Sequence, residues 1–172
     1  PPPVALPDTV ELAAGTSATF SPLFGSGGLV TPDASGPALV PSTSCLVDPG
    51  TNTCGLSVTI AGEGTFTLDR TTGVVTYAAL ATATAGQKTP VTYRITDATG
   101  FVASSTLTPT VWPKPTASPD TSTGKQGATQ VLEPVANDSA GAPARPLDAS
   151  SVLLCGPGES GTGCTKTTVT VP

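Results

Sequence analysis

The four cysteines are the residues whose type and spacing most clearly favour a chemical bond. They form two pairs whose members are nine positions apart, Cys45 with Cys54 and Cys155 with Cys164. Turn-forming residues lie between them, a Pro-Gly step in the first pair and several glycines in the second. Two cysteines that flank a turn can face each other across a hairpin at disulfide distance. We therefore predict the disulfides Cys45–Cys54 and Cys155–Cys164, which indicate an oxidising compartment.

Zinc binding is the alternative use of these cysteines. Structural zinc sites usually leave about two to four residues between neighbouring ligands and often include histidine. This sequence has wider spacings and contains no histidine. A crossed bond such as Cys45 with Cys155 is disfavoured because each pair is complete within its own part of the chain. The lack of histidine also removes the commonest general base, and we predict no catalytic residue and no enzyme.

Two carboxylates, Asp69 and Asp97, are of the type that a glycoside hydrolase would use as a pair. Each of them comes directly before a turn, in Asp69-Arg-Thr-Thr-Gly73 and in Asp97-Ala-Thr-Gly100. Aspartate is favoured in such turns for its own backbone hydrogen bonds. No aromatic residues that could line a sugar pocket accompany them, so we interpret both as turn residues.

Several other side chains have a chemical and a simpler interpretation. Trp112 could stack on a sugar, but packing at a joint between domains is favoured. Lys88, Lys114 and Lys125 raise the idea of a lysine–asparagine isopeptide bond, yet the sequence places none of them beside an asparagine and a buried acid. Asn137-Asp-Ser139 is a formal N-glycosylation sequon.

The composition narrows the class of protein to which these side chains belong. The 172 residues include 19 glycines and 19 prolines, which disfavour long helices. The net charge is −5, and the seven lysines and arginines are scattered, so we predict neither nucleic-acid binding nor membrane insertion. The opening Pro1-Pro-Pro has no features of a signal peptide and is typical of the interior or a processed end of a longer protein.

An internal repeat is the main organising feature. Ala5-Leu-Pro-Asp-Thr9 recurs as Ala117-Ser-Pro-Asp-Thr121, a shift of 112, while both cysteine pairs repeat at a shift of 110. Glycine and proline positions follow the same shift of 112, as do apolar positions; the matches are Gly15 with Gly127, Phe20 with Leu132, Pro22 with Pro134 and Leu23 with Val135. We predict a complete repeat over 5–112, a stiff proline-rich linker over 113–119 and the first half of a second repeat over 117–172.

The repeat also bears on whether the chain binds calcium. Asp120, Asn137, Asp138 and Asp148 could offer the hard oxygen ligands that calcium prefers. The first copy has Gly25-Ser26 where the second has Asn137-Asp138, and a repeat protein that depended on calcium should carry the ligands in both copies. We favour turn roles for these residues and predict no cofactor, with calcium as a weak alternative.

Period-two alternation predicts the fold. Inward positions are expected at Val10, Leu12, Ala18, Phe20, Leu56, Val58, Ile60, Phe66, Leu68, Val75, Tyr77, Val91, Tyr93, Ile95, Phe101, Ala103, Leu107 and Val111. Segment 22–44 has no clear period and is expected to be a long loop. Seven or eight short strands per unit of about 110 residues predict an all-β, Ig-like β-sandwich tandem repeat.

Two stretches of the first repeat resemble a known family. Gly64-Thr-Phe-Thr-Leu-Asp-Arg-Thr-Thr-Gly-Val-Val-Thr-Tyr77 and Thr89-Pro-Val-Thr-Tyr-Arg-Ile-Thr-Asp-Ala-Thr-Gly100 are similar to the CshA-type fibril repeat of bacterial surface adhesins. In the second copy, Pro119-Asp-Thr, Val131-Leu-Glu-Pro-Val-Ala-Asn-Asp138 and Leu147-Asp-Ala-Ser-Ser-Val152 also resemble it. The resemblance implies tandem domains that hold a binding tip away from the cell wall.

We therefore expect a structural stalk repeat of a secreted or wall-attached adhesin, located outside the cell. Its partners would be neighbouring repeats of the same chain, with host ligands bound through other regions. Two alternatives stay open. The first is a filament subunit completed by strands from a neighbouring copy, because half a sandwich exposes strand edges. The second is a carbohydrate- or ligand-binding accessory module, which would need a row of exposed aromatic residues.

Overall fold

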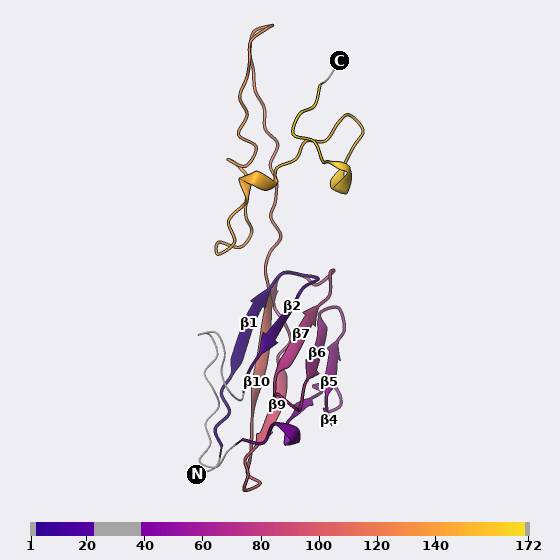
Figure 1. The fold of residues 1–172 in the computed structure, drawn as a ribbon, viewed down its shortest axis with the longest axis vertical. Helices are drawn as coiled ribbons and strands as arrows, with labels where there is room; N and C mark the ends of the chain where they lie inside the picture. The colour runs from indigo at the N-terminus through magenta and orange to yellow at the C-terminus, as the bar shows by residue number, and fades with distance from the viewer. Residues whose placement is uncertain (1–2, 23–38, 171–172) are drawn as a thin grey trace. The chain divides into compact units, whose positions relative to one another are not determined.

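The structure, a computed structural model, describes residues 3–22 and 39–170 (Figure 1). The chain divides into two compact units, Pro1–Pro113 and Lys114–Pro172. Most of the loop predicted over 22–44 lies outside the described residues, and so do Leu23 and the Gly25-Ser26 pair.

The described part of the first unit is built from β-strands in two sheets, which confirms the predicted all-β sandwich. One sheet has six strands, in the order β1-β10-β9-β3-β4 with β8 also paired to β10, and the other has the order β2-β7-β6-β5 (Figure 1). The strands are β1 Asp8–Leu12, β2 Ser17–Phe20, β3 Cys45–Val47, β4 Cys54–Gly55, β5 Ser57–Ile60, β6 Gly64–Leu68, β7 Val75–Ala79, β8 Gly86–Gln87, β9 Val91–Thr96 and β10 Val102–Val111. A short 3-10 helix, η1 Pro41–Thr43, precedes β3.

Alternation of apolar and polar residues places one face of each strand in the core. In β9, Val91, Tyr93 and Ile95 are buried, while Arg94 between them is exposed. β-branched and aromatic side chains fit this pleated, half-buried surface. The aromatic centre of the core is a group of three rings, with Phe66 6.3 Å from Phe20 and 4.7 Å from Tyr77 between ring centroids.

Two residues expected to face inward do not. Leu56 is 45% exposed and precedes β5, and Phe101 is 58% exposed and precedes β10. Both predictions extended a strand's alternation into the adjoining turn, where the backbone no longer follows the pleat. Leu107 and Val111, further along β10, are buried as expected.

The first and last strands of this unit run side by side in the same direction. β1 pairs in parallel with β10, with Asp8 opposite Leu107 and Leu12 opposite Val111. Every other strand pair in the described part of the unit is antiparallel. The chain therefore enters β1 and leaves β10 in the same direction.

The second unit has little regular structure. Its described residues contain two 3-10 helices, η2 Ala149–Ser151 and η3 Gly161–Gly163, and two isolated bridges, Thr116 with Ser139 and Leu154 with Lys166, but no strand. Figure 1 shows residues 117–138 as two extended limbs joined by a turn.

One turn of the second unit repeats a turn of the first. Gly15 has a φ of 77° and Gly127 a φ of 76°. In both turns an amide donates to the carbonyl three residues earlier, Thr16 to Ala13 at 3.2 Å and Ala128 to Lys125 at 3.0 Å. Glycine is required at these positions because other residues rarely adopt a positive φ. The shift of 112 found in the sequence thus holds for backbone conformation at this point.

Further along, the correspondence moves by a few residues. η1 and η2 align at a shift of 108 (149 − 41), and so do the Pro-Gly steps at 49–50 and 157–158. Cys45 and Cys155 lie between these two features and align at a shift of 110, so the shift differs from one feature to the next. Loop insertions change the spacing between elements, while the elements themselves keep their order.

Candidate functional site

Both cysteine pairs lie at disulfide distance, as their spacing predicts. Cys45 and Cys54 are bonded with 5.6 Å between their Cα atoms, and Cys155 and Cys164 with 4.3 Å. The described residues contain no free cysteine. Each pair bridges its own turn, so the crossed pairing does not occur.

The first disulfide joins an edge strand to the sheet. β3 lies between β4 and β9, and Leu46 is opposite Gly55 on one side and Tyr93 on the other. The turn between the cysteines is closed by Asp48, whose Oδ1 accepts hydrogen bonds from the amides of Gly50 at 2.7 Å and Thr51 at 3.1 Å. β4 has only two residues, so the covalent bond replaces hydrogen bonds that such a short strand cannot form.

The second disulfide closes a loop held mainly by local contacts. The amide of Gly156 donates to Glu159 Oε2 at 2.7 Å, and Glu159 also forms an ion pair with Lys166. This lysine, together with the Gly156 amide, lowers the pKa of Glu159. The bridge between Leu154 and Lys166 brings the ends of the loop together, so the loop is closed without a sheet.

Asp69 and Asp97 occupy turns, as expected, and the turns belong to different sheets. Asp69 lies between β6 and β7, where Oδ1 accepts from the Thr71 amide at 2.8 Å and Oδ2 accepts from the Thr72 hydroxyl at 3.0 Å. Asp97 lies between β9 and β10, and its Oδ1 accepts from the Thr99 amide, the Thr99 hydroxyl and the Phe101 amide. These hydrogen bonds account for both carboxylates as turn residues.

Asp97 is buried, and its turn keeps it charged. Burial acts against the charged carboxylate, but the hydrogen bonds from Thr99, Phe101 and Gly100 outweigh it and hold the pKa of Asp97 below its ordinary value. The carboxylate therefore stabilises the folded hairpin only while it is ionised.

The lowered pKa predicts a dependence of stability on pH. A group whose pKa is lower in the folded state stabilises the protein above its unfolded pKa, about 3.9 for aspartate, and loses that effect as the pH falls through the folded pKa. We expect the free energy of unfolding to fall as the pH drops below about 4, and to fall less steeply in Asp97→Asn. Urea denaturation at a series of pH values measures this; Asp120→Asn, at an exposed position, is the control. Identical pH slopes for wild type and Asp97→Asn would contradict the prediction.

The calcium candidates take part in hydrogen bonds of the second unit. Asp138 Oδ1 accepts from the Ser118 amide at 2.7 Å, and Asn137 Nδ2 donates to the Pro119 carbonyl at 3.2 Å. Asp148 caps η2 by accepting from the Ser150 amide at 2.9 Å. Asp120 is exposed, and its counterpart in the first unit at the shift of 112 is Asp8, a buried residue of β1. Turn roles without a cofactor stay the prediction for these residues, with calcium as the weaker alternative.

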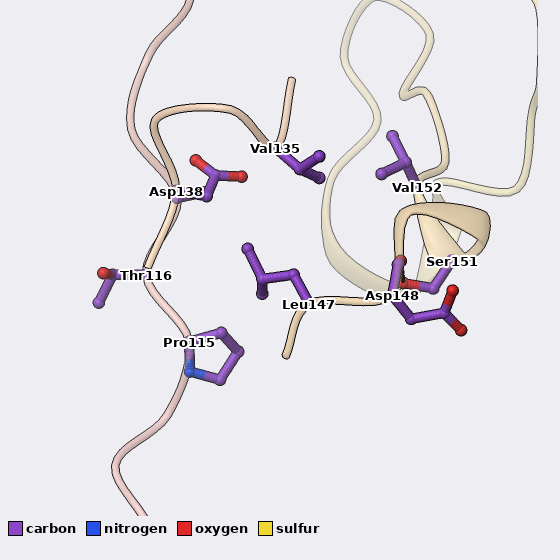
Figure 2. A pocket seen from close by; sticks show the side chains of 9 residues that line it. Pro115, Thr116, Val135, Asp138, Leu147, Asp148, Ser151 and Val152 are labelled. Atoms are coloured by element: carbon purple, nitrogen blue, oxygen red, sulfur yellow. Dashed lines mark hydrogen bonds between the residues drawn. The ribbon is translucent and has the colours of Figure 1, made fainter. Parts of the chain in front are cut away.

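The same region contains a cavity of about 230 Å³ within the second unit. Figure 2 shows Val135, Leu147 and Val152 around one space, with Asp138 on one side of it and Asp148 on the other. Within residues 3–22 and 39–170, no group of three or more His, Cys, Asp or Glu side chains is arranged to hold a metal ion. Because Val135, Leu147 and Val152 line it, this cavity is better suited to contact with other apolar groups than to binding an ion.

Trp112 follows β10 and is fixed to β1. Its amide donates to the Leu12 carbonyl at 2.9 Å, and its indole Nε1 donates to Glu11 Oε2 at 3.2 Å. Among the described aromatic side chains only Phe101 is exposed. The row of exposed rings that a carbohydrate-binding module would need is therefore not found in the described residues.

The three lysines considered for an isopeptide bond are in different environments. Lys88 is buried, and its Nζ donates to the Thr84 hydroxyl at 3.2 Å. Lys114 and Lys125 are exposed and belong to the second unit. Asn137, in the sequon, is exposed as well.

Contacts between distant parts of the chain were not apparent from the sequence. Tyr93 Oη donates to the Leu6 carbonyl at 2.9 Å, across 87 residues, and fixes the segment before β1. Glu63 accepts from the Thr89 amide at 2.8 Å and from its hydroxyl at 3.1 Å. An alignment of related sequences could have indicated such pairs, whereas local spacing within one sequence contains no signal for them.

Comparison with known proteins identifies the first unit. A family model described as the surface adhesin CshA repetitive domain matches residues 2–111, almost the whole of that unit. A search of curated proteins found no match. None of the helices in the described ranges has the length and apolar character needed to cross a membrane.

Proposed function

Because the chain belongs to the family of the surface adhesin CshA repetitive domain, we propose that it is a structural stalk repeat that holds a binding region away from the cell surface. The family implies a surface adhesin repeat and supports a location outside the cell or at its surface. The stalk role is the further step, and the topology of the first unit supports it.

The observation that carries this proposal is the parallel pairing of the first and last strands. Because β1 and β10 run in the same direction, the entry to β1 and the exit from β10 lie at opposite ends of the strand pair. β10 has ten residues, and at about 3.3 Å per residue it spans most of the length of a sandwich. Repeats connected in this way extend a rod, whereas antiparallel terminal strands would turn the chain back.

The same pairing suits a unit that is pulled at its ends. Tension along the chain would slide β1 against β10, and the hydrogen bonds between them would share the load instead of breaking one at a time. Both ends of this pair are fixed by further contacts, Tyr93 with the Leu6 carbonyl at entry and Trp112 with Glu11 and Leu12 at exit. The terminal strands are therefore fixed where a stalk would transmit force.

Force spectroscopy on the whole chain, held at its two ends, tests the proposal. We expect the first unit to resist force and then open in one step that releases roughly 300 Å of chain. Forced opening reports the unfolding rate under load. A single abrupt step would indicate that the hydrogen bonds between β1 and β10 hold together and then break at once.

Reductant provides an internal control for the same measurement. The loop closed by Cys45–Cys54 is hidden from the applied force, and reduction should lengthen the step by about 30 Å. A lengthened step identifies the first unit as the source of the signal. Gradual extension at low force, without a step, would contradict a load-bearing role.

A further inference from the structure

β5 forms an open edge of the four-stranded sheet. It pairs with β6 and, within the described residues, with no other strand (Figure 1). The segment from Gly55 to Gly62 contains no charged residue and no proline. Edge strands of natural proteins often carry such residues, because they prevent pairing with another chain. The edge of β5 therefore lacks the sequence features that commonly block strand addition.

The hydrogen bonds to β6 indicate which backbone groups of β5 point outward. The Leu68 amide donates to the Leu56 carbonyl at 2.8 Å. In an antiparallel pair of strands, hydrogen-bonded and non-hydrogen-bonded residue pairs alternate, so Val58 also bonds to β6. Ser57 and Thr59 then belong to the non-hydrogen-bonded pairs of this ladder. Their backbone N–H and C=O groups therefore point away from β6, toward the open edge.

Two further observations agree with this assignment. The hydroxyls of Thr59 and Thr65, which are opposite each other in one of these pairs, lie 3.0 Å apart. Side chains approach most closely across non-hydrogen-bonded pairs. Ser57 and Thr59 are also exposed. The edge thus offers two N–H and two C=O groups, from residues two positions apart, to an incoming strand.

A second copy of β5 that runs antiparallel matches these groups in a symmetric register. With Val58 opposite Val58 of the second copy, Ser57 of each copy is opposite Thr59 of the other. Each of these two pairs forms two hydrogen bonds, and all the outward N–H and C=O groups of both copies are then used. A twofold axis relates the two copies, so the contact surface is the same on each.

The same register gives an exposed leucine a partner. Leu56 directly precedes β5 and is 45% exposed. Ile60, at the other end of β5, is half-buried and packs against the core. In the symmetric register Leu56 would be opposite Ile60 of the second copy, and apolar side chains opposite each other across two strands stabilise their pairing.

We propose that β5 is a docking edge for a second copy of this chain, at which the two β5 strands pair antiparallel and join the two four-stranded sheets into one. The partner is a second copy because the outward groups, their spacing and the exposed Leu56 are complementary to themselves. The pairing involves only the first unit and goes beyond the proposed function.

The antiparallel direction also determines which copies can meet. Stalks anchored on one surface all point the same way, so their β5 strands are parallel. Stalks on two facing surfaces point toward each other, and their β5 strands are antiparallel. The edge is therefore suited to contact between two surfaces that both carry this chain. This orientation rests on the proposed stalk role, whereas the pairing itself does not.

Exchange of charges at the paired positions tests the register. Wild-type chain should show a reversible monomer–dimer equilibrium in sedimentation equilibrium at concentrations up to about 1 mM. A variant with Ser57→Glu and Thr59→Glu should not pair with itself, because like charges would be opposite each other. A variant with Ser57→Lys and Thr59→Lys should fail in the same way. At low salt an equimolar mixture of the two should associate at least about 10-fold more strongly than either alone.

β2, the opposite edge of the same sheet, provides the matched control. Ser17 and Thr19 are exposed and two positions apart, so the same charges can be placed there. Mixing these control variants should give no added association beyond that of each alone. If it gave as much as the β5 variants, general attraction between opposite charges would explain both results, and the proposal would be wrong.

Ser57→Pro tests the backbone hydrogen bonds directly. Proline lacks an N–H and is tolerated on edge strands where that group faces solvent. The first unit should therefore keep its urea midpoint while dimerisation is lost, and Thr59→Pro should act in the same way. A folded Ser57→Pro variant that still dimerises would contradict the register.

The remaining outcomes separate the edge from the stalk role. A wild-type chain that stays monomeric at every concentration would overturn the docking edge, whatever the force measurement shows. If the chain dimerises in the proposed register but its first unit yields without a force step, the stalk role and the contact between facing surfaces fail. The docking edge then stands by itself.

Discussion

Replacing Phe66 with alanine should lower the free energy of unfolding of the first unit by about 3–5 kcal/mol. Phe66 is fully buried, and its ring centroid lies 6.3 Å from that of Phe20 and 4.7 Å from that of Tyr77. Removal of the ring loses its burial and leaves a cavity between the two sheets. Small domains are stable by only about 5–15 kcal/mol, so this loss would be a large part of the total.

Urea denaturation of the whole chain, followed by the fluorescence of Trp112, measures the effect. Trp112 is the only tryptophan, and its bonds to Glu11 and Leu12 make its environment depend on the β1–β10 pair. Phe101→Ala is the matched control, because Phe101 is 58% exposed and exposed substitutions usually change stability by less than about 0.5 kcal/mol. Equal losses for the two variants would show that the aromatic cluster is not the centre of the core.

The strands with clear alternation could be predicted from the sequence, together with the turns between them. The apolar positions of β9 are buried as expected. The turn after it closes with the Gly100 amide donating to the Asp97 carbonyl at 3.0 Å, and Gly100 has the positive φ expected of it, 88°. These features depend on neighbours within a few residues, so their signal is present in any short window of the sequence.

Features that depend on distant strands could not be predicted in the same way. Nothing in β1 or β10 alone indicates that they are parallel neighbours, since period-two alternation is the same in either direction. The errors at Leu56 and Phe101 have a related cause: a strand ends where its partner ends, and the alternating pattern does not contain that information.

The same distinction between local and distant contacts applies to the candidate residues. The cysteine pairs could be predicted from the sequence because both partners lie in one turn. The contact between Tyr93 and the Leu6 carbonyl could not be predicted, because 87 residues separate the two. The internal repeat is the exception among long-range features: it identified the turns at Gly15 and Gly127 as equivalent, and both have the same backbone conformation.

Removal of the first disulfide, by Cys45→Ala with Cys54→Ala, should lower the free energy of unfolding of the first unit by about 2.7 kcal/mol. Closing this ten-residue turn restricts the unfolded chain, and the bond also holds the two-residue β4 against β3. Alanine is preferred to serine because Cys45 is buried, and a buried hydroxyl without a partner would add its own cost. Urea denaturation gives the change directly.

The second disulfide is the matched control, because it closes a turn of the same length outside the first unit. Cys155→Ala with Cys164→Ala should leave the urea midpoint of the first unit unchanged and speed amide exchange only within residues 155–164. The loop-entropy effect of the two bonds is the same, so the difference between the variants reports the attachment of the first turn, through β3, to the sheet of the first unit. If both variants lowered the midpoint equally, the attachment of the first turn to the sheet would contribute nothing to stability, and the prediction would be wrong.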